Sequence, residues 1–396
     1  MLKLPVYLDN NATTPVDPGV LEAMLPYFTE RFGNAASRSH SFGWVAEEAV
    51  LQAREQVAQL IHSDPSEIVF TSGATEAINL ALKGVVEMYG SKGKHIITCA
   101  TEHKAVLDTC HHLEKSGATV TYLGVNKDGL IDLHELQAAI QNDTVLISMM
   151  LANNETGLLQ PIREIAGIAK QDGILFFTDA TQAVGKIPVD VNDYNVDLLC
   201  LSAHKIYGPK GVGALYVRRR NPRVRLVAQI DGGGHEKGMR SGTLNVPGIV
   251  GLGEACAIAE MKLDDETQCI ANLRDKLEKA LLQLEGVVVN GDIKLRLPNV
   301  TNVSFAGVKG NKLLTEINRT IAVSSGSACT SANPEPSHVL KAMGVEDQLA
   351  NSSIRFGLGR FTTEEEIAYV ITEVGRIVLK LREGNESLLQ KNNTAM

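Results

Sequence analysis

Between residues 66 and 220, short apolar runs alternate with longer stretches in which apolar residues recur at helical spacing. The runs predict strands at 68–71, 95–99, 119–125, 144–151, 174–178, 197–201 and 213–217. The periodic stretches predict helices near 75–89, 104–116, 132–140 and 161–171. Strands that alternate with helices of this length predict an α/β fold with a mostly parallel, seven-stranded sheet covered on both faces.

A different pattern follows residue 220. Helices are predicted near 246–261 and 266–284, and shorter strands near 287–289, 300–305 and 353–358. The last helix should span about 363–383, because Thr362 and Glu365 have capping-box spacing at its start. We expect it to end at Gly384-Asn385 and the polar tail 385–396 to be disordered.

Composition narrows the classes of function. The 396 residues carry a net charge of −8, which gives no sign of a nucleic-acid partner. No apolar run reaches the ~18–20 residues needed to cross a bilayer. Asp9 and Asn10 stand where a signal peptide would need its apolar region. A cytoplasmic protein without membrane or nucleic-acid partners is therefore expected.

The six cysteines are Cys99, Cys110, Cys200, Cys256, Cys269 and Cys329. Their spacing matches neither a zinc site nor a C-x-x-C motif, and a cytosolic protein is not expected to contain a disulfide framework. Five lie in apolar, periodic segments and are predicted to be core residues. Cys329 differs, because residues 324–333 contain no large apolar side chain that could anchor them to a core. We expect this segment to open at low free-energy cost.

Ligands of open α/β sheets gather beyond the carboxyl ends of the strands, so the residues at those ends are informative. The strand at 68–71 runs into the small-residue turn Ser72-Gly73-Ala74-Thr75, where a helix begins. Free backbone N–H groups and the helix dipole suit a phosphate there, and the Thr75 hydroxyl can also donate. An ordinary N-capped helix is the alternative.

Asp179 follows four apolar residues of a predicted buried strand. Buried carboxylates are rare without a cationic partner, and a pyridinium nitrogen would be such a partner. Gln182 could then reach the phenolic oxygen of the same ring. The alternative is an aspartate that pairs with a neighbouring helix end.

Lys205 lies just beyond the next strand, 26 residues after Asp179. Desolvation can lower the pKa of such a lysine, which can then form a Schiff base. Ser202 and His204 flank it as candidate phosphate donors. An isolated lysine at a strand end is usually a surface charge, but the three strand ends together specify pyridoxal phosphate.

Motifs spread over nearly the whole chain carry a resemblance to a known family. They are Tyr7-Leu8-Asp9-Asn10-Asn11-Ala12-Thr13-Thr14-Pro15, Thr101-Glu102-His103, Asn153-Asn154-Glu155-Thr156-Gly157, Arg240-Ser241-Gly242-Thr243, Ser324-Ser325-Gly326-Ser327-Ala328-Cys329-Thr330-Ser331 and Ser353-Ile354-Arg355-Phe356. The chain resembles the cysteine desulfurases of the IscS/NifS type, which belong to the class-V aminotransferases among the fold-type I pyridoxal-phosphate enzymes.

The resemblance implies a role for each matching residue. Lys205 corresponds to the Schiff-base lysine, Cys329 to the sulfur-accepting nucleophile, and His103 to a residue that stacks on the ring and moves protons. Asp179 and Gln182 match the partners of the ring nitrogen and ring oxygen. The phosphate cup would comprise Ala74, Thr75, Ser202 and His204, with Thr243 from the other subunit of a homodimer. Asn154 matches a residue near ring and substrate, and Arg355 the clamp for the substrate carboxylate, which its planar fork suits.

The implied activity converts L-cysteine to L-alanine and leaves the sulfur on Cys329 as a persulfide for iron–sulfur cluster assembly and other acceptors. The implied large domain spans 15–262; the small domain comprises 1–14 and 263–384 and carries the cysteine loop at about 324–338, which resembles the longer form in the family. No resident metal is implied, although Cys329 could transiently bind an iron–sulfur cluster shared with a scaffold protein. The tail around 388–394 does not match the scaffold-binding tail of IscS-type enzymes, which leaves delivery to a scaffold open.

Rival functions remain at this point. A selenocysteine lyase, a cysteine sulfinate desulfinase or a small-molecule aminotransferase could use the same fold, although an aminotransferase has no use for Cys329. A non-catalytic iron–sulfur carrier would need several clustered thiolates, whereas Cys329 alone is expected to be exposed.

Overall fold

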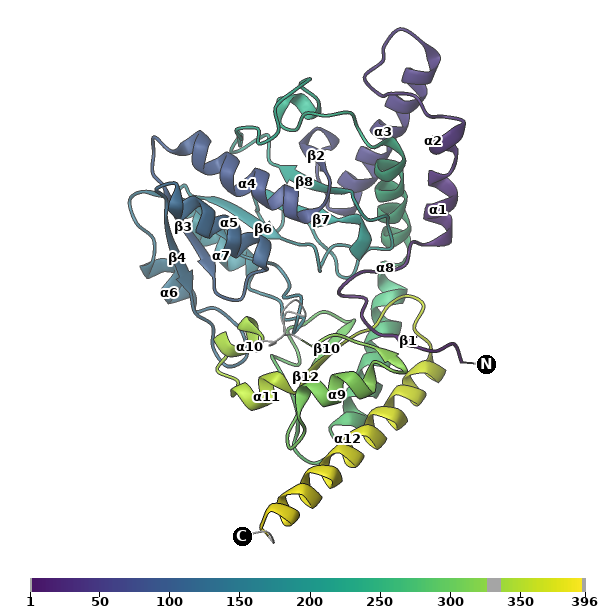
Figure 1. Cartoon of the computed structure of the whole chain (residues 1–396). Coiled ribbons are helices and arrows are strands. Elements are labelled where there is room, and N and C mark those ends of the chain that lie inside the picture. Colours follow the sequence, from purple (N-terminus) through teal and green to yellow (C-terminus); the bar gives the residue numbers. More distant parts are fainter. Residues whose placement is uncertain (1, 326–335, 394–396) are drawn as a thin grey trace.

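A seven-stranded sheet forms the larger part of the computed structural model, which describes residues 2–325 and 336–393. Its order is β2-β8-β7-β6-β5-β3-β4 (Figure 1). The strands are β2 (Ile68–Thr71), β3 (His95–Cys99), β4 (Thr119–Leu123), β5 (Thr144–Ser148), β6 (Leu175–Asp179), β7 (Leu198–Ser202) and β8 (Gly213–Val217). Strand β8 runs antiparallel to both its neighbours, and the other pairs are parallel, so the predicted mostly parallel sheet is confirmed.

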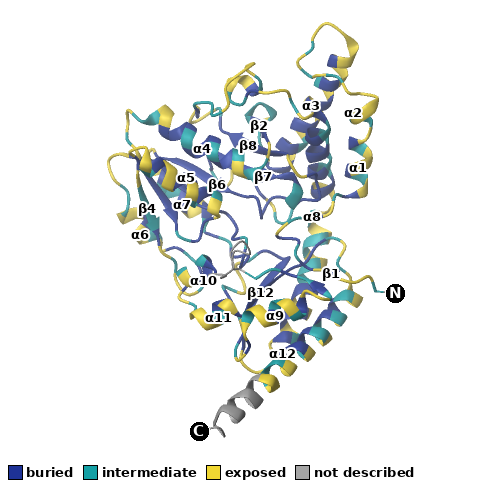
Figure 2. Cartoon of the chain, viewed as in Figure 1, coloured by how far each residue is buried: buried dark blue, intermediate teal, exposed yellow. Residues whose placement is uncertain are grey.

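Helices cover both faces of this sheet. Helices α4 (Ala74–Tyr89) and α5 (Lys104–Lys115) pack on one face, whereas α3 (Ser41–Leu60), α7 (Ile162–Gln171) and part of α8 (Val246–Leu281) pack on the other. Successive strand residues therefore enter different cores, as Phe176 and Phe177 do. Most of the sheet is buried, which is why its strands are continuous apolar runs in the sequence (Figure 2).

A second core lies beside the large sheet. It contains the antiparallel sheet β12-β10-β9, formed by β12 (Ser353–Gly357), β10 (Val300–Phe305) and β9 (Val287–Val289). Both ends of the chain contribute, because β1 (Val6–Tyr7) pairs in parallel with β11 (Ile321–Ala322). The remaining helices of this region are α9 (Gly310–Ile317), α10 (His338–Ala342), α11 (Asp347–Asn351) and α12 (Glu364–Asn393).

The long helix α8 joins the two cores. The prediction of two helices over 246–284 is wrong, because one helix runs unbroken from Val246 to Leu281. Its buried apolar residues up to Ala259 belong to the first core, and those from Leu273 belong to the second. The turns between them are largely exposed, so Cys269 is exposed and not the core residue that its apolar context predicted. On this ground we propose a boundary near residue 262, with a large domain of 15–262 and a small domain of 1–14 and 263–384.

The end of the last helix also differs from expectation. Helix α12 does not end at Gly384 but continues to Asn393. A single glycine costs a helix only about 1 kcal/mol relative to alanine, and the Glu, Leu, Gln and Lys that follow favour helix. The remaining helices are α1 (Pro18–Met24) and α2 (Pro26–Thr29), which contact α8, and α6 (Leu133–Ala138), which contacts α7. No helix in the described part of the chain is long and apolar enough to cross a bilayer.

Candidate active site

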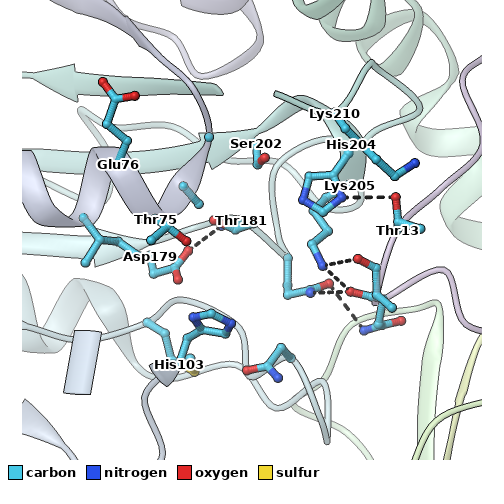
Figure 3. Close-up of a pocket in the computed structure, with 18 of the residues that line it drawn as sticks. Thr13, Thr75, Glu76, His103, Asp179, Thr181, Ser202, His204, Lys205 and Lys210 are labelled. Carbon is cyan, nitrogen blue, oxygen red and sulfur yellow. Dashed lines mark hydrogen bonds between the residues drawn. The ribbon is translucent and has the colours of Figure 1, made fainter. Parts of the chain in front are cut away.

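A cavity of about 650 Å³ opens at the carboxyl ends of the central strands, between the large sheet and the second core (Figure 3). The predicted site residues that line it are Ala74, Thr75, His103, Asn154, Asp179, Gln182, Ser202, His204, Lys205 and Arg355. These residues come from strand ends far apart in the sequence. The structure thus brings ten candidate residues to one place.

One end of the cavity is formed by the start of α4. The residue that precedes this helix, Gly73, has a φ of 149° and offers no side chain to cap it. A Cβ atom on Gly73 would lie 3.6 Å from Ser202 Oγ, so the two strand ends converge closely. Backbone N–H groups of an uncapped helix start, together with the hydroxyls of Thr75 and Ser202, form a donor set suited to a phosphate dianion.

Glu76, in the first turn of α4, does not oppose an anion there. Its carboxylate pairs with Arg240 at 2.7 Å and accepts from the Ser72 backbone N–H at 2.8 Å. Figure 3 shows it turned away from Lys205 and Asp179. The hydrogen bonds to Arg240 and Ser72 outweigh burial and lower the pKa of Glu76.

Asp179 ends β6 at the other side of the cavity and is buried. Its Oδ1 atom accepts from the Thr181 backbone N–H at 2.9 Å and from Cys200 Sγ at 3.3 Å. Among the described residues, no hydrogen bond reaches Oδ2. A carboxylate held by one oxygen can therefore present the other to a cationic ring nitrogen.

His103 faces the same space from the start of α5 (Figure 3). Its Nδ1 atom accepts from the Ala105 backbone N–H at 3.1 Å, which assigns the proton of the neutral ring to Nε2. Desolvation lowers the pKa of His103, although Asp179 opposes this effect. A neutral imidazole fixed by its backbone bond can stack on a ring and exchange a proton at Nε2.

Lys205 reaches across the cavity to the N-terminal segment. Its Nζ atom donates to the carbonyl oxygens of Asn11, at 2.5 Å, and Ala12, at 2.7 Å. Desolvation, assisted by the charge of Arg355, lowers the pKa of Lys205 to about 8. A larger fraction of this amine is therefore neutral near physiological pH than for an ordinary lysine, which favours covalent attachment to an aldehyde.

A polar network surrounds Lys205. Gln182 donates to the Asn11 carbonyl at 3.0 Å and accepts at Oε1 from Lys186 Nζ at 3.0 Å. Desolvation and the neighbouring cations lower the pKa of Lys186 to about 7. His204 Nδ1 lies 3.2 Å from Thr13 Oγ1, and desolvation and Lys205 lower its pKa to about 4.

Sequence reasoning gave no site role to the contributions of Asn11, Ala12 and Thr13. The motif that contains them was part of the family resemblance and could have indicated a site. Two of the contacts to Lys205 are made by backbone carbonyls, however, and every residue type has a backbone carbonyl. Lys210, Gly211, Met150 and Thr181 also line the cavity.

Two predicted residues are not among the lining residues of this chain. Thr243 is exposed outside the cavity, and Cys329 lies outside the described residues. No group of three or more His, Cys, Asp or Glu side chains in the described ranges could hold a metal ion.

Comparisons with known proteins agree with this geometry. Residues 6–370 match the aminotransferase class-V family. The chain is 60% identical over 383 residues to the cysteine desulfurase IscS of Anaeromyxobacter dehalogenans, which covers 96% of this chain and 94% of that protein. It is 58% identical over 384 residues to the cysteine desulfurase IscS of Pectobacterium carotovorum, with 96% and 95% coverage.

Solved structures of related proteins superpose over almost the full length. A NifS-like protein gives a TM-score of 0.89 at 41% identity and covers 96% of this chain and all of that one. SspA in complex with cysteine gives a TM-score of 0.81 at 39% identity, with 90% and 100% coverage.

Proposed function

The chain belongs to the class-V aminotransferase family and, within it, to the cysteine desulfurases of the IscS/NifS type; from this premise we propose that its cavity holds pyridoxal phosphate and acts on L-cysteine. The observation that carries the proposal is one cavity lined by Lys205, Asp179 and the uncapped start of α4. An amine of lowered pKa, a carboxylate and a phosphate site are the three groups that this cofactor requires.

The lining residues fit the cofactor from end to end. Thr75, Ser202 and the backbone N–H groups that begin α4, with Ala74 and His204 beside them, would hold the phosphate. Asp179 would pair with the ring nitrogen, and Gln182 would donate to the ring oxygen through its amide. Once bound, the cofactor supplies an electron sink for bonds to the substrate's α- and β-carbons.

The side chains of the protein position the substrate and move its protons. Arg355 binds the cysteine carboxylate, and Asn154, whose carbonyl contacts Arg355, lines the wall beside it. Lys205 would accept and return protons at the substrate's α-carbon. His103 exchanges a proton through Nε2, the ring nitrogen not bonded to the backbone.

Sulfur transfer requires a thiolate, and we assign this role to Cys329. Its sulfur attacks the substrate sulfur, so an S–S bond forms as the Cβ–Sγ bond of cysteine breaks. The β-carbon leaves with the electron pair, takes up a proton and becomes the methyl group of alanine. Cys329 keeps the sulfur as a persulfide until a sulfur acceptor takes it, and an iron–sulfur scaffold protein is one candidate acceptor. We propose that the enzyme works in the cytoplasm.

Product analysis tests the proposed reaction. Purified protein with L-cysteine and a thiol reductant should release alanine and sulfide in equal amounts, and a visible absorbance band should disappear on borohydride treatment. Keto-acid formation without sulfide would indicate an aminotransferase instead. Activity on selenocysteine or cysteine sulfinate, with none on cysteine, would favour a lyase or desulfinase. A protein with broad sulfide-to-iron bands and no borohydride-sensitive band would be an iron–sulfur carrier.

An exposed apolar patch supports a homodimer. We define the patch as the exposed large apolar side chains between residues 21 and 51, a segment that runs from α1 through α2 and the following loop into α3. They are Leu21, Leu25, Phe28, Phe32, Phe42, Trp44, Val45 and Leu51, with exposed fractions from 38% to 63%. So many neighbouring apolar side chains rarely stay exposed in a monomer. We propose a second copy of the chain as the occupant, because its Thr243 would also complete the phosphate site. Thr243 is exposed and stands three residues before α8. The first turns of α8 pack on Met24 of α1 and Ala53 of α3, so Thr243 leads into a helix that packs on the helices that carry the patch.

Charge in the apolar patch should separate the subunits and reduce activity. Phe28→Asp with Phe32→Asp places two desolvated carboxylates in the proposed interface, so we expect a monomer with at least about tenfold weaker activity. Light scattering with an activity assay measures both. Ile293→Asp alters an equally exposed residue elsewhere and should leave a dimer. A fully active monomeric wild type would contradict the proposal.

A further inference from the structure

Asp9 forms an ion pair with Arg355, the residue proposed to bind the substrate carboxylate, and none of the roles above explains this ion pair. Its Oδ1 accepts from Arg355 Nη2 at 2.8 Å, and its Oδ2 accepts from Ser324 Oγ at 2.8 Å. Both ion-pair partners are largely buried, with side-chain exposures of 18% for Asp9 and 10% for Arg355. The carboxylate is thus fixed at both oxygens.

The backbone around Asp9 is equally constrained. The preceding strand β1 pairs with β11, and Asp9 itself forms a bridge with Gly357. Leu8, beside it, is fully buried, and its carbonyl accepts from the Gly357 N–H at 2.7 Å. Asp9 therefore gives Arg355 an acceptor that is held by the backbone pairing of its own segment and by the hydroxyl of Ser324.

Arg355 has a second fixed acceptor. Its Nη1 donates to the backbone carbonyl of Asn154 at 2.8 Å, while Nε is buried without a hydrogen-bond partner among the described residues. Two acceptors on different elements set the plane of the guanidinium. The Nη hydrogens that neither acceptor uses then remain available to a carboxylate in the cavity that Arg355 lines.

We propose that Asp9 is a positioning residue that holds Arg355 in the orientation required to bind the substrate carboxylate. This inference rests on the proposed role of Arg355. A freely rotating arginine loses side-chain entropy when it binds a ligand, whereas one already held in place does not. Asp9 contributes to substrate affinity although it does not touch the substrate.

Ligand pairs that differ only in the carboxylate provide the test. L-Alanine has the carboxylate but no thiol, and ethylamine is alanine without its carboxylate. In the holoenzyme, each is titrated against the visible cofactor band. For Asp9→Ala we expect the half-saturating alanine concentration to rise about tenfold, as for the loss of roughly one charge-assisted hydrogen bond, with ethylamine unchanged.

Matched variants separate positioning from general stability. Asp9→Asn keeps an acceptor oxygen in place and should restore most of the alanine affinity. If Asp9→Ala does not fold, Asp9→Glu displaces the carboxylate and should show the same alanine-selective loss. Asp17→Ala removes a comparable buried pair, Asp17–Arg360 at 2.6 Å, and should leave both titrations unchanged.

Three outcomes would overturn the inference: an unchanged alanine titration in Asp9→Ala, an equal loss for alanine and ethylamine, or the same selective loss in Asp17→Ala. A wild-type protein without a cofactor band, or with a band that alanine does not perturb, would instead refute the proposed function. The two failures are therefore distinguishable.

Discussion

Lys205→Ala is expected to abolish desulfurase turnover and the borohydride-sensitive absorbance band. Lys205 lines the cavity three residues beyond the end of β7, the strand that pairs with the strand of Asp179. Desolvation lowers its pKa to about 8. An alanine provides no amine for covalent attachment or for proton transfer at the α-carbon. The loss should be at least about 10³-fold, as for a nucleophile that is also an acid–base group.

Two other lysines near the cavity could in principle replace Lys205, and they provide controls for this prediction. Lys210 also lines the cavity, and desolvation lowers the pKa of Lys186 to about 7. Lys210→Ala should keep the reducible band and serves as the matched control. Lys186 already donates to Gln182 and is expected to remain there. If Lys205→Ala retains a reducible band, peptide mapping after borohydride treatment would show which lysine carries the cofactor, and our assignment would be wrong.

Cys329→Ser is expected to keep the cofactor and to perturb its band on addition of cysteine, yet to transfer no sulfur. A serine hydroxyl is not ionised near neutral pH and cannot replace a thiolate as the sulfur acceptor. Wild-type protein treated with cysteine should gain one sulfur atom, about 32 Da, on the peptide that contains Cys329. Mass spectrometry of both proteins measures this directly.

The remaining cysteines are poor competitors. Burial raises the pKa of Cys99 to about 11 and of Cys110 to about 12, and it also raises the pKa values of Cys200 and Cys256. Cys269 is the exposed thiol among the described cysteines, but it is not a lining residue of the cavity. Cys269→Ser should therefore be fully active. Sulfur found on any cysteine other than Cys329 would refute the choice of nucleophile.

The buried strands could be predicted from sequence to within three residues at either end, because a strand covered on both faces is a continuous apolar run. The ends of β6 and β7 also identified Asp179 and Lys205, since a polar residue after such a run has to lie at the rim. Helix α8 was divided wrongly because its middle turns are exposed between two cores, and the loss of apolar periodicity was read as a break.

The rest of the site depends on tertiary contacts that residue types do not encode. The acceptors for Lys205 are backbone carbonyls of Asn11 and Ala12, nearly 200 positions away. The partner of Arg355 is Asp9, from the opposite end of the chain. The position of Asp9 follows from the pairing of β1 with β11, which no local pattern predicts because the two strands are only two residues long.

The pairing of β1 with β11 has a consequence for biosynthesis. Tyr7 leaves the ribosome early, but its partner Ala322 emerges only after most of the chain has been made. The large sheet is complete by Val217, so it can fold while the N-terminal segment still lacks its strand partner. Arg355 is made later still, so Asp9 gains its ion-pair partner only late in synthesis. A nascent chain truncated before that point carries Lys205 without the arginine that would bind a substrate carboxylate.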